Sequence, residues 1–276
     1  MNGQGWKLEG ERLKERSKRL PLIAPNETEQ KFYEKYVQKV KGNCLVLGAT
    51  PEPRDVAIRN GLKCYAVDIS QNMLDKFTPL MKYKDSNLNI MIQNNWLNME
   101  FEDNFFDIAL GDGSFFNIVT KRDYESIIKI LRKIIKPNGF LILREVHSRE
   151  IEPLSLKKVV LMYRNNEITL SDFFAEIRLV IPLKKCLNKE TYQMSAEDVF
   201  NLIDREYKKG VLNKEERDKL FLYKNKLVNL IYPKKEFISL FEKYGFKLIE
   251  ESNFGEYRFQ KYGKMFAFQK TINNIS

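Results

Sequence analysis

Short apolar runs alternate with helical patterns along the first half of the chain. The apolar runs, each bounded by turn or helix-start signals, predict strands at 44–47, 63–67, 88–92, 105–110 and 140–143. Between them, apolar residues recur at helical spacing in segments that begin with a capping residue, such as Asn26, Ser70 or Thr120. Strands and helices that alternate in this way predict an α/β fold, a doubly wound and mostly parallel sheet with helices on both faces.

The second half of the chain has a different pattern. Residues 148–233 lack the alternation and contain only helical segments rich in lysine, leucine and aromatic residues. A short helix closed by Gly245 and two strands, at 246–250 and 265–269, follow. We therefore expect an N-terminal arm at 1–28, one α/β domain formed by 29–147 and 234–276, and a helical insertion at 148–233. The insertion, with the aromatic residues Tyr163, Phe173, Phe174 and Tyr192, is expected to be a substrate lid, or else a helical decoration or a dimer surface.

The first strand and the second end on residues suited to nucleotide binding. The run at 44–47 ends on Gly48, and Ala49-Thr50-Pro51-Glu52 then gives a helix start with Thr50 as N-cap. The second strand ends on Asp68, 20 residues after Gly48. A glycine lets a ligand approach the backbone, and a carboxylate at this distance accepts hydrogen bonds from two ribose hydroxyls. This pair predicts a cofactor that contains adenosine.

The glycine count separates two cofactor classes. A dinucleotide site needs G-x-G-x-x-G to hold a pyrophosphate, and here Gly48 stands alone. A nicotinamide oxidoreductase is therefore disfavoured. S-adenosylmethionine carries no phosphate, and the segment at 47–52 resembles motif I of the class I (Rossmann-like) methyltransferases in its L-G-x-T-P-E variant. The resemblance covers about residues 30–146 and 235–270. It implies a seven-stranded sheet with the last strand antiparallel, S-adenosylmethionine as cofactor and S-adenosylhomocysteine as product.

The resemblance also implies further cofactor contacts. Ile69 or Met73 is expected to supply an apolar wall beside the adenine, since the family often uses the residue after the ribose-binding acid. Asn95 and Trp96 stand where the family commonly has an acidic residue near the adenine amino group, although Trp96 is equally suited to packing in the sheet edge. The full set of expected cofactor residues is Gly48, Ala49, Thr50, Asp68, Ile69, Met73, Asn95, Trp96, Gly111, Asp112 and Gly113.

Two further features carry the expected chemistry. Gly111-Asp112-Gly113-Ser114 follows the fourth strand; the glycines are expected to form a backbone platform for the methionine part of the cofactor, with Asp112 near its amino group or the substrate, or else a plain tight turn. If the fifth strand ends at Leu143, residues 144–147 are expected to face the cleft where the methyl group is presented. His147, the only histidine, is then a candidate general base, or a surface or packed histidine without a catalytic role. No cluster has the spacing of metal ligands, so we expect no metal.

Composition limits the partners. The 276 residues carry 47 lysines and arginines against 37 acidic residues, a net charge of +10. Because the lysines are dispersed among acids, the excess charge indicates nucleic acid only weakly. The N-P-P-Y type signature that the family uses for flipped bases is absent, and Gly111-Asp112-Gly113-Ser114 occupies its place. No segment predicts a membrane span, and Cys44, Cys64 and Cys186 lack paired spacing, which indicates a reducing, cytoplasmic setting.

Together these features predict an S-adenosylmethionine-dependent methyltransferase that acts on a small molecule or a peptide. Two alternatives stay open. The net charge allows an RNA methyltransferase, and the fold allows a protein that binds S-adenosylmethionine for regulation without catalysis. The sequence does not specify the acceptor atom or the oligomeric state.

Overall fold

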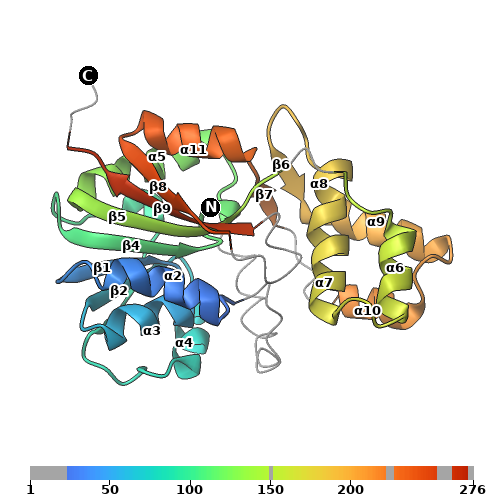
Figure 1. The fold of residues 1–276 in the computed structure, drawn as a ribbon, viewed down its shortest axis with the longest axis horizontal. Helices are drawn as coiled ribbons and strands as arrows, with labels where there is room; N and C mark the ends of the chain where they lie inside the picture. The colour runs from blue at the N-terminus through green and yellow to red at the C-terminus, as the bar shows by residue number, and fades with distance from the viewer. Residues whose placement is uncertain (1–23, 149–151, 222–226, 254–262, 273–276) are drawn as a thin grey trace.

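A computed structural model describes residues 24–148, 152–221, 227–253 and 263–272 (Figure 1). The expected arm at 1–28 lies largely outside these residues. A seven-stranded sheet has the order β3-β2-β1-β4-β5-β9-β8, in which β9 is antiparallel to both of its neighbours. The predicted fold class is thereby confirmed. Its strands are β1 (Asn43–Leu47), β2 (Lys63–Asp68), β3 (Asn89–Gln93), β4 (Phe106–Asp112), β5 (Ile135–Val146), β8 (Phe246–Glu251) and β9 (Gly263–Lys270).

Helices cover both faces of the sheet (Figure 1). One face packs against α2 (Glu27–Val37), α3 (Pro51–Arg59) and α4 (Gln71–Phe77), and the other against α5 (Lys121–Ile134) and α11 (Lys234–Lys243). The starts of α2, α4 and α5 are capped by the predicted side chains of Asn26, Ser70 and Thr120. Since the helices run back from the carboxyl ends of the strands, those ends and the helix starts share one edge of the sheet.

Two strands are longer than their apolar runs indicate. β4 continues through Gly111 and Asp112, and β5 continues through Arg144 to Val146. Gly111 pairs with Leu47 on one side and with Leu143 on the other. The predicted strand ends at Leu110 and Leu143 were therefore wrong. Pairing with neighbours on both sides keeps these polar and glycine residues in the sheet.

The segment between β5 and α11 forms a second cluster of helices, on the right of Figure 1. It has its own apolar core, which includes Val159, Phe173, Phe200 and Ile203. The segment is not purely helical, because β6 and β7 pair antiparallel within it. Its elements are α6 (Leu156–Arg164), α7 (Leu170–Ala175), a π-helical turn (Glu176–Val180), α8 (Ile181–Lys185), β6 (Gln193–Ser195), α9 (Ala196–Lys208), α10 (Lys214–Leu220) and β7 (Val228–Leu230).

All three cysteines are free thiols. Cys44 and Cys64 are adjacent in β1 and β2, are fully buried and are free thiols, and Cys186 is free and partly buried. Burial raises the pKa of Cys64 to about 12, so this thiol stays protonated. Within the described ranges, no helix combines the length and the apolar character that a membrane crossing requires.

Candidate functional site

Gly48, Asp68 and Trp96 meet where β1 and β2 end. Gly48 has φ +110°, a conformation that side chains rarely adopt. A Cβ at Gly48 would lie 3.8 Å from Asp68 Oδ2 and 3.9 Å from Trp96 Cζ2. The Val67 carbonyl accepts hydrogen bonds from Gly48 N at 2.8 Å and from Trp96 Nε1 at 2.7 Å. The bare glycine backbone therefore lies beside a carboxylate, as binding of a ribose requires.

Burial sets the charge state of Asp68. It raises the pKa of this carboxyl to about 6, although the backbone N–H groups of Ser70 and Ala49 act in the opposite direction. The N–H of Ser70 lies 2.8 Å from Oδ1. Near neutral pH Asp68 is thus mostly ionised and accepts hydrogen bonds from hydroxyl groups.

A buried arginine supports the loop between β1 and α3. Arg54 is fully buried, and its Nη1 donates to the Ala49 carbonyl at 3.3 Å. Its Nη2 donates to Thr78 Oγ1 at 3.0 Å and to Asn89 Oδ1 at 2.9 Å. Thr50 is the N-cap residue, but its side chain makes no capping hydrogen bond. Arg54 therefore holds this loop in place. The sequence did not predict this role, because one arginine within a helical pattern gives no sign of it.

The residues expected around an adenine have mixed surroundings. Trp96 is 7% exposed, and its ring N–H already binds the Val67 carbonyl, which favours the packing interpretation. Asn95 Oδ1 accepts the Leu97 N–H at 3.1 Å and so caps the short helix after β3. Met73 packs in the core between α4 and the sheet, while Ile69 is partly exposed. Contacts of these residues with an adenine stay predictions.

The two glycines at the end of β4 have different environments: Gly111 lies within the strand, and Gly113 follows its last residue, Asp112. A Cβ at Gly111 would lie 2.8 Å from both Leu143 Cδ2 and Ser114 Oγ, so glycine is needed there for close packing. Gly113 has φ +60°, and a Cβ there would meet nothing within 4 Å. Of the two glycines, Gly113 is the one that borders open space.

The side chain of Asp112 lies in a buried ion cluster. Arg144 Nη1 lies 2.9 Å from Asp112 Oδ1, and Arg144 Nε lies 2.8 Å from Glu29 Oε1. The three side chains are at most 8% exposed. Tyr33 joins them from α2, because its hydroxyl donates to the Gly111 carbonyl at 2.7 Å. The expectation that Arg144 faces a cleft was wrong, because its guanidinium is bound between two carboxylates.

Glu145 points to the opposite face of the sheet and holds the loop after β4. Its carboxylate accepts hydrogen bonds from Phe115 N at 2.8 Å and Phe116 N at 3.0 Å. Burial raises its pKa to about 8, although these donors lower it. Sequence reasoning missed Glu29, Tyr33 and Glu145; the signal available was the Arg-Glu pair directly after the apolar run of β5.

His147 follows β5, as expected, but it does not face a cleft. Its side chain is fully buried, and its ring packs edge-on against Phe266, with 6.1 Å between the ring centroids. The next residue, Ser148, is tied to the end of the insertion, because its N–H donates to the Tyr232 carbonyl at 3.0 Å. The expected exposure was wrong, because β5 continues to Val146 and His147 therefore lies next to the point where the insertion begins. Its catalytic role stays a prediction.

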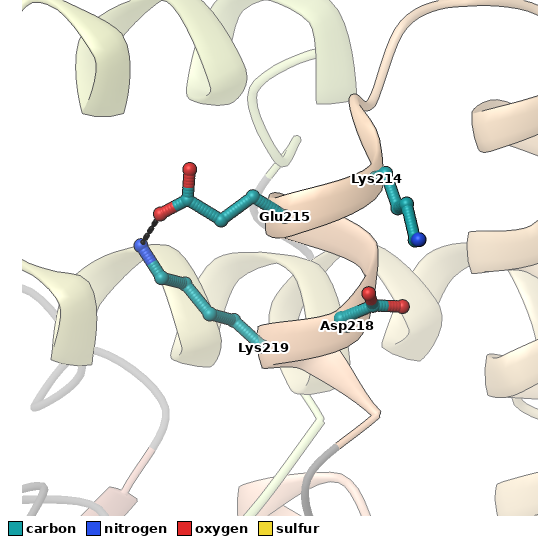
Figure 2. Close-up of a pocket in the computed structure, with 4 residues that line it drawn as sticks. All are labelled: Lys214, Glu215, Asp218 and Lys219. Atoms are coloured by element: carbon teal, nitrogen blue, oxygen red, sulfur yellow. Dashed lines mark ion pairs between the residues drawn. The ribbon is translucent and has the colours of Figure 1, made fainter.

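A surface hollow lies elsewhere, on α10. Figure 2 shows its lining residues, Lys214, Glu215, Asp218 and Lys219, and an ion pair of 2.7 Å between Glu215 and Lys219. All four are charged side chains on one short helix of the insertion, and none belongs to a strand end. This hollow is a solvated helix surface and not part of the candidate site.

The structure thus brings together part of the predicted set. Gly48, Asp68 and Trp96 are in direct proximity. Asp112 is the last residue of β4, which pairs with β1, and Gly113 follows it. Among the residues that the structure describes, no group of three histidine, cysteine or acidic side chains has a metal-binding arrangement.

Comparison with known proteins bears on the family and on the fold. Residues 48–143 match a family model described as a methyltransferase domain. No curated protein has a significantly similar sequence. The fold is similar to that of a Pyrococcus horikoshii OT3 protein, with 17% identity, a TM-score of 0.54 and coverage of 93% of this chain and 99% of that chain.

Two further solved structures share the fold. An S-adenosylmethionine-dependent methyltransferase of Methanosarcina mazei is 15% identical, with a TM-score of 0.53 and coverage of 88% and 98%. The 1,6-didemethyltoxoflavin-N1-methyltransferase of Burkholderia thailandensis, solved with 1,6-didemethyltoxoflavin and S-adenosylhomocysteine, is 9% identical, with a TM-score of 0.56 and coverage of 96% and 85%. In both cases the first of the two coverage values refers to this chain and the second to the other chain.

Proposed function

We propose that this chain, in which residues 48–143 match a methyltransferase domain, is a class I S-adenosylmethionine-dependent methyltransferase that methylates a small molecule or a peptide by in-line displacement. When bound, S-adenosylmethionine supplies an electrophilic methyl group on its sulfonium. Transfer would place this methyl group on the acceptor and would leave S-adenosylhomocysteine as the product. The residues of the chain therefore have to bind, align and exclude water rather than supply a nucleophile.

The proposal that the cofactor binds where β1 and β2 end rests on one observation, the proximity of a bare glycine to a carboxylate. The backbone of Gly48 carries no side chain and lies beside Asp68. The mostly ionised carboxylate of Asp68 accepts hydrogen bonds from the two ribose hydroxyls. We assign Gly113 and the backbone around it to the methionine end of the cofactor. The ion pair with Arg144 holds the side chain of Asp112 in place. Asp112 then orients the methionine end of the cofactor and does not transfer a proton.

The position of the insertion favours a small acceptor. Asn229 Nδ2 donates to the Phe116 carbonyl at 3.1 Å, and Gln193 Nε2 donates to the Val119 carbonyl at 2.8 Å. The insertion is thereby fixed to the loop after β4, at the edge where the methyl group is presented. A lid formed by a segment attached at this edge would limit the size of the acceptor, which suits a small molecule or a short peptide. The Burkholderia neighbour was solved with a small molecule, 1,6-didemethyltoxoflavin, bound.

The aromatic residues of the insertion contribute less to this site than the sequence indicates. Phe173 and Phe174 are buried, and Tyr163 stacks on Phe173 with 4.2 Å between ring centroids. Tyr192 lies near the junction, where its hydroxyl donates to Glu236 at 2.6 Å. The first three residues hold the insertion together and do not form an aromatic wall for a substrate.

An RNA acceptor is the second candidate, because the net charge is +10. The basic residues are interleaved with acids, and many form ion pairs, for example Arg164 with Glu216 and Arg217 with Asp204. We expect binding to transfer RNA to be weak and to fall steeply between about 50 and 200 mM salt, as for nonspecific phosphate contacts. Fluorescence anisotropy with labelled transfer RNA measures this directly.

The matching activity assay follows S-adenosylhomocysteine release with a metabolite extract and with total RNA as alternative acceptors. Release that depends on the small-molecule fraction supports the proposal. RNA binding that is sequence-specific and survives physiological salt, with release that depends on RNA, would replace it. Cofactor binding without release in either fraction would favour the regulatory alternative.

A further inference from the structure

The helix α2 is attached to the carboxyl ends of β4 and β5 by buried polar contacts. The Tyr33 hydroxyl donates to the Gly111 carbonyl on β4, and the Glu29 carboxylate pairs with Arg144 on β5. Both side chains are at most 2% exposed. The partners lie 78 and 115 residues away in the sequence, so these contacts form only in the folded protein.

Glu29 serves two purposes at once. Its Oε2 accepts the Asn26 N–H at 2.9 Å, which completes the capping box at the start of α2. Its Oε1 lies 2.8 Å from Arg144 Nε, and Arg144 in turn binds Asp112. The start of α2 therefore cannot move without moving the guanidinium that holds Asp112.

Two glycines raise the entropic cost of ordering the segment held in this way. Gly111 and Gly113 flank Asp112, and glycine loses more conformational freedom on ordering than any other residue. Gly113 N donates to the Arg144 carbonyl at 2.7 Å, so the same arginine fixes the platform through its backbone as well as its side chain. A ligand that binds to an already ordered platform does not have to order it on binding.

We propose that Tyr33 and Glu29 are positioning residues for the methionine end of the cofactor. They act through Gly111, Asp112 and Arg144 and do not touch the cofactor, because their side chains are buried in α2 contacts. They also lie outside residues 48–143, the part of the chain that matches the methyltransferase domain. This inference rests on the proposed placement of the cofactor at Asp68 and Gly113.

The chemistry of Tyr33 is consistent with a permanent donor. Burial raises the pKa of its hydroxyl well above the usual value of 10, and the nearby Asp112 raises it further. The hydroxyl therefore keeps its proton at every pH used for an assay. Replacement by phenylalanine removes this hydrogen bond alone and leaves the ring in place.

The test compares Tyr33→Phe with Tyr36→Phe on the same helix. Tyr36 is also buried and donates its hydroxyl to Glu250, which is away from the platform, so it is a matched control. For Tyr33→Phe we expect KM for S-adenosylmethionine and Kd for S-adenosylhomocysteine to rise by about 5- to 20-fold, on the order of one lost hydrogen bond. At saturating cofactor, kcat should stay within about threefold of the wild type, since the reacting groups are unchanged. Tyr36→Phe should leave KM and Kd unchanged.

Glu29→Gln gives a second, independent variant. Glutamine can still accept the Asn26 N–H in the capping box but loses the charge that pairs with Arg144. We expect the same rise in KM and Kd. If Tyr33→Phe does not fold, Glu29→Gln decides the question by the same measurement.

Calorimetry of Asp68→Ala, measured beside these variants, distinguishes failure of the positioning role from failure of the proposed cofactor site. Weakened binding in Asp68→Ala together with wild-type KM and Kd in Tyr33→Phe and Glu29→Gln would overturn the positioning role alone. Unchanged binding in Asp68→Ala would overturn the placement of the cofactor itself. A loss of thermal stability in Tyr33→Phe with an unchanged KM would assign Tyr33 to the stability of the fold and also overturn the proposal.

Discussion

Asp68→Ala is expected to weaken binding of S-adenosylhomocysteine by about 10- to 150-fold, which corresponds to about 1.5–3 kcal/mol for hydrogen bonds to a charged group. The carboxylate lies beside the bare backbone of Gly48, so it is the expected acceptor for both ribose hydroxyls. Isothermal titration calorimetry measures the change. Asp75→Ala is the matched control, because Asp75 is on the neighbouring helix α4 and its carboxylate interacts with the exposed Gln71. Equal affinities in Asp68→Ala and the wild type would contradict this assignment.

The pH dependence of binding gives a second signature of Asp68. Burial raises its pKa to about 6 in the free protein, and ribose hydroxyls donate to the ionised form. Affinity should therefore be constant well above pH 6 and fall below it, by up to about tenfold per pH unit. The free protein behaves in the opposite sense: the raised pKa means that ionisation of Asp68 lowers folding stability as the pH rises from about 4 through about 6. Thermal stabilisation by S-adenosylhomocysteine should accordingly be larger at pH 7.5 than at pH 5.5, and Asp68→Asn should lose this difference.

His147→Ala is expected to lower turnover by roughly two to four powers of ten while cofactor affinity stays nearly unchanged, as for the loss of a general base. This prediction applies to an acceptor that must lose a proton, such as a phenol or an amine, because His147 is the candidate at this edge whose ordinary pKa is near neutrality. The ring is fully buried against Phe266, and Ser148 beside it binds the end of the insertion. We therefore expect the insertion to open before this ring can reach an acceptor.

Two measurements make the His147 prediction decisive. Single-turnover rates, followed against pH in the wild type and in His147→Ala, should show an acid limb in the wild type that the variant lacks. Thermal unfolding of the same variant reports the loss of packing against Phe266. Full activity together with reduced stability would show that His147 is a packed histidine, and alignment of the acceptor would then be the main source of the rate.

The fold could be predicted because its signals are local. Each parallel strand is a short apolar run, and the caps at Asn26, Ser70 and Thr120 mark helix starts with two or three residues. The Gly48–Asp68 spacing is local in the same sense, since one βαβ unit contains both residues. β6 and β7 were missed because three-residue strands are too short for a periodic pattern to form.

The rest of the site depends on contacts that no local pattern encodes. Arg144 and Glu145 are charged residues inside a strand, and each is stabilised there by a partner distant in the sequence: Glu29 for the first and the loop at Phe115 for the second. These partners cannot be seen in the local sequence, so the two charged residues led to the prediction that β5 ends at Leu143. The same error placed His147 at an open edge, because a strand three residues shorter would end before the junction with the insertion.

Titration of the purified protein with S-adenosylhomocysteine and, separately, with NADH tests the central claim most directly. The lone Gly48 and the ionised Asp68 predict saturable binding of S-adenosylhomocysteine with one site per chain and no heat of binding for NADH. Tight binding of NADH, with no binding of S-adenosylhomocysteine, would contradict the account.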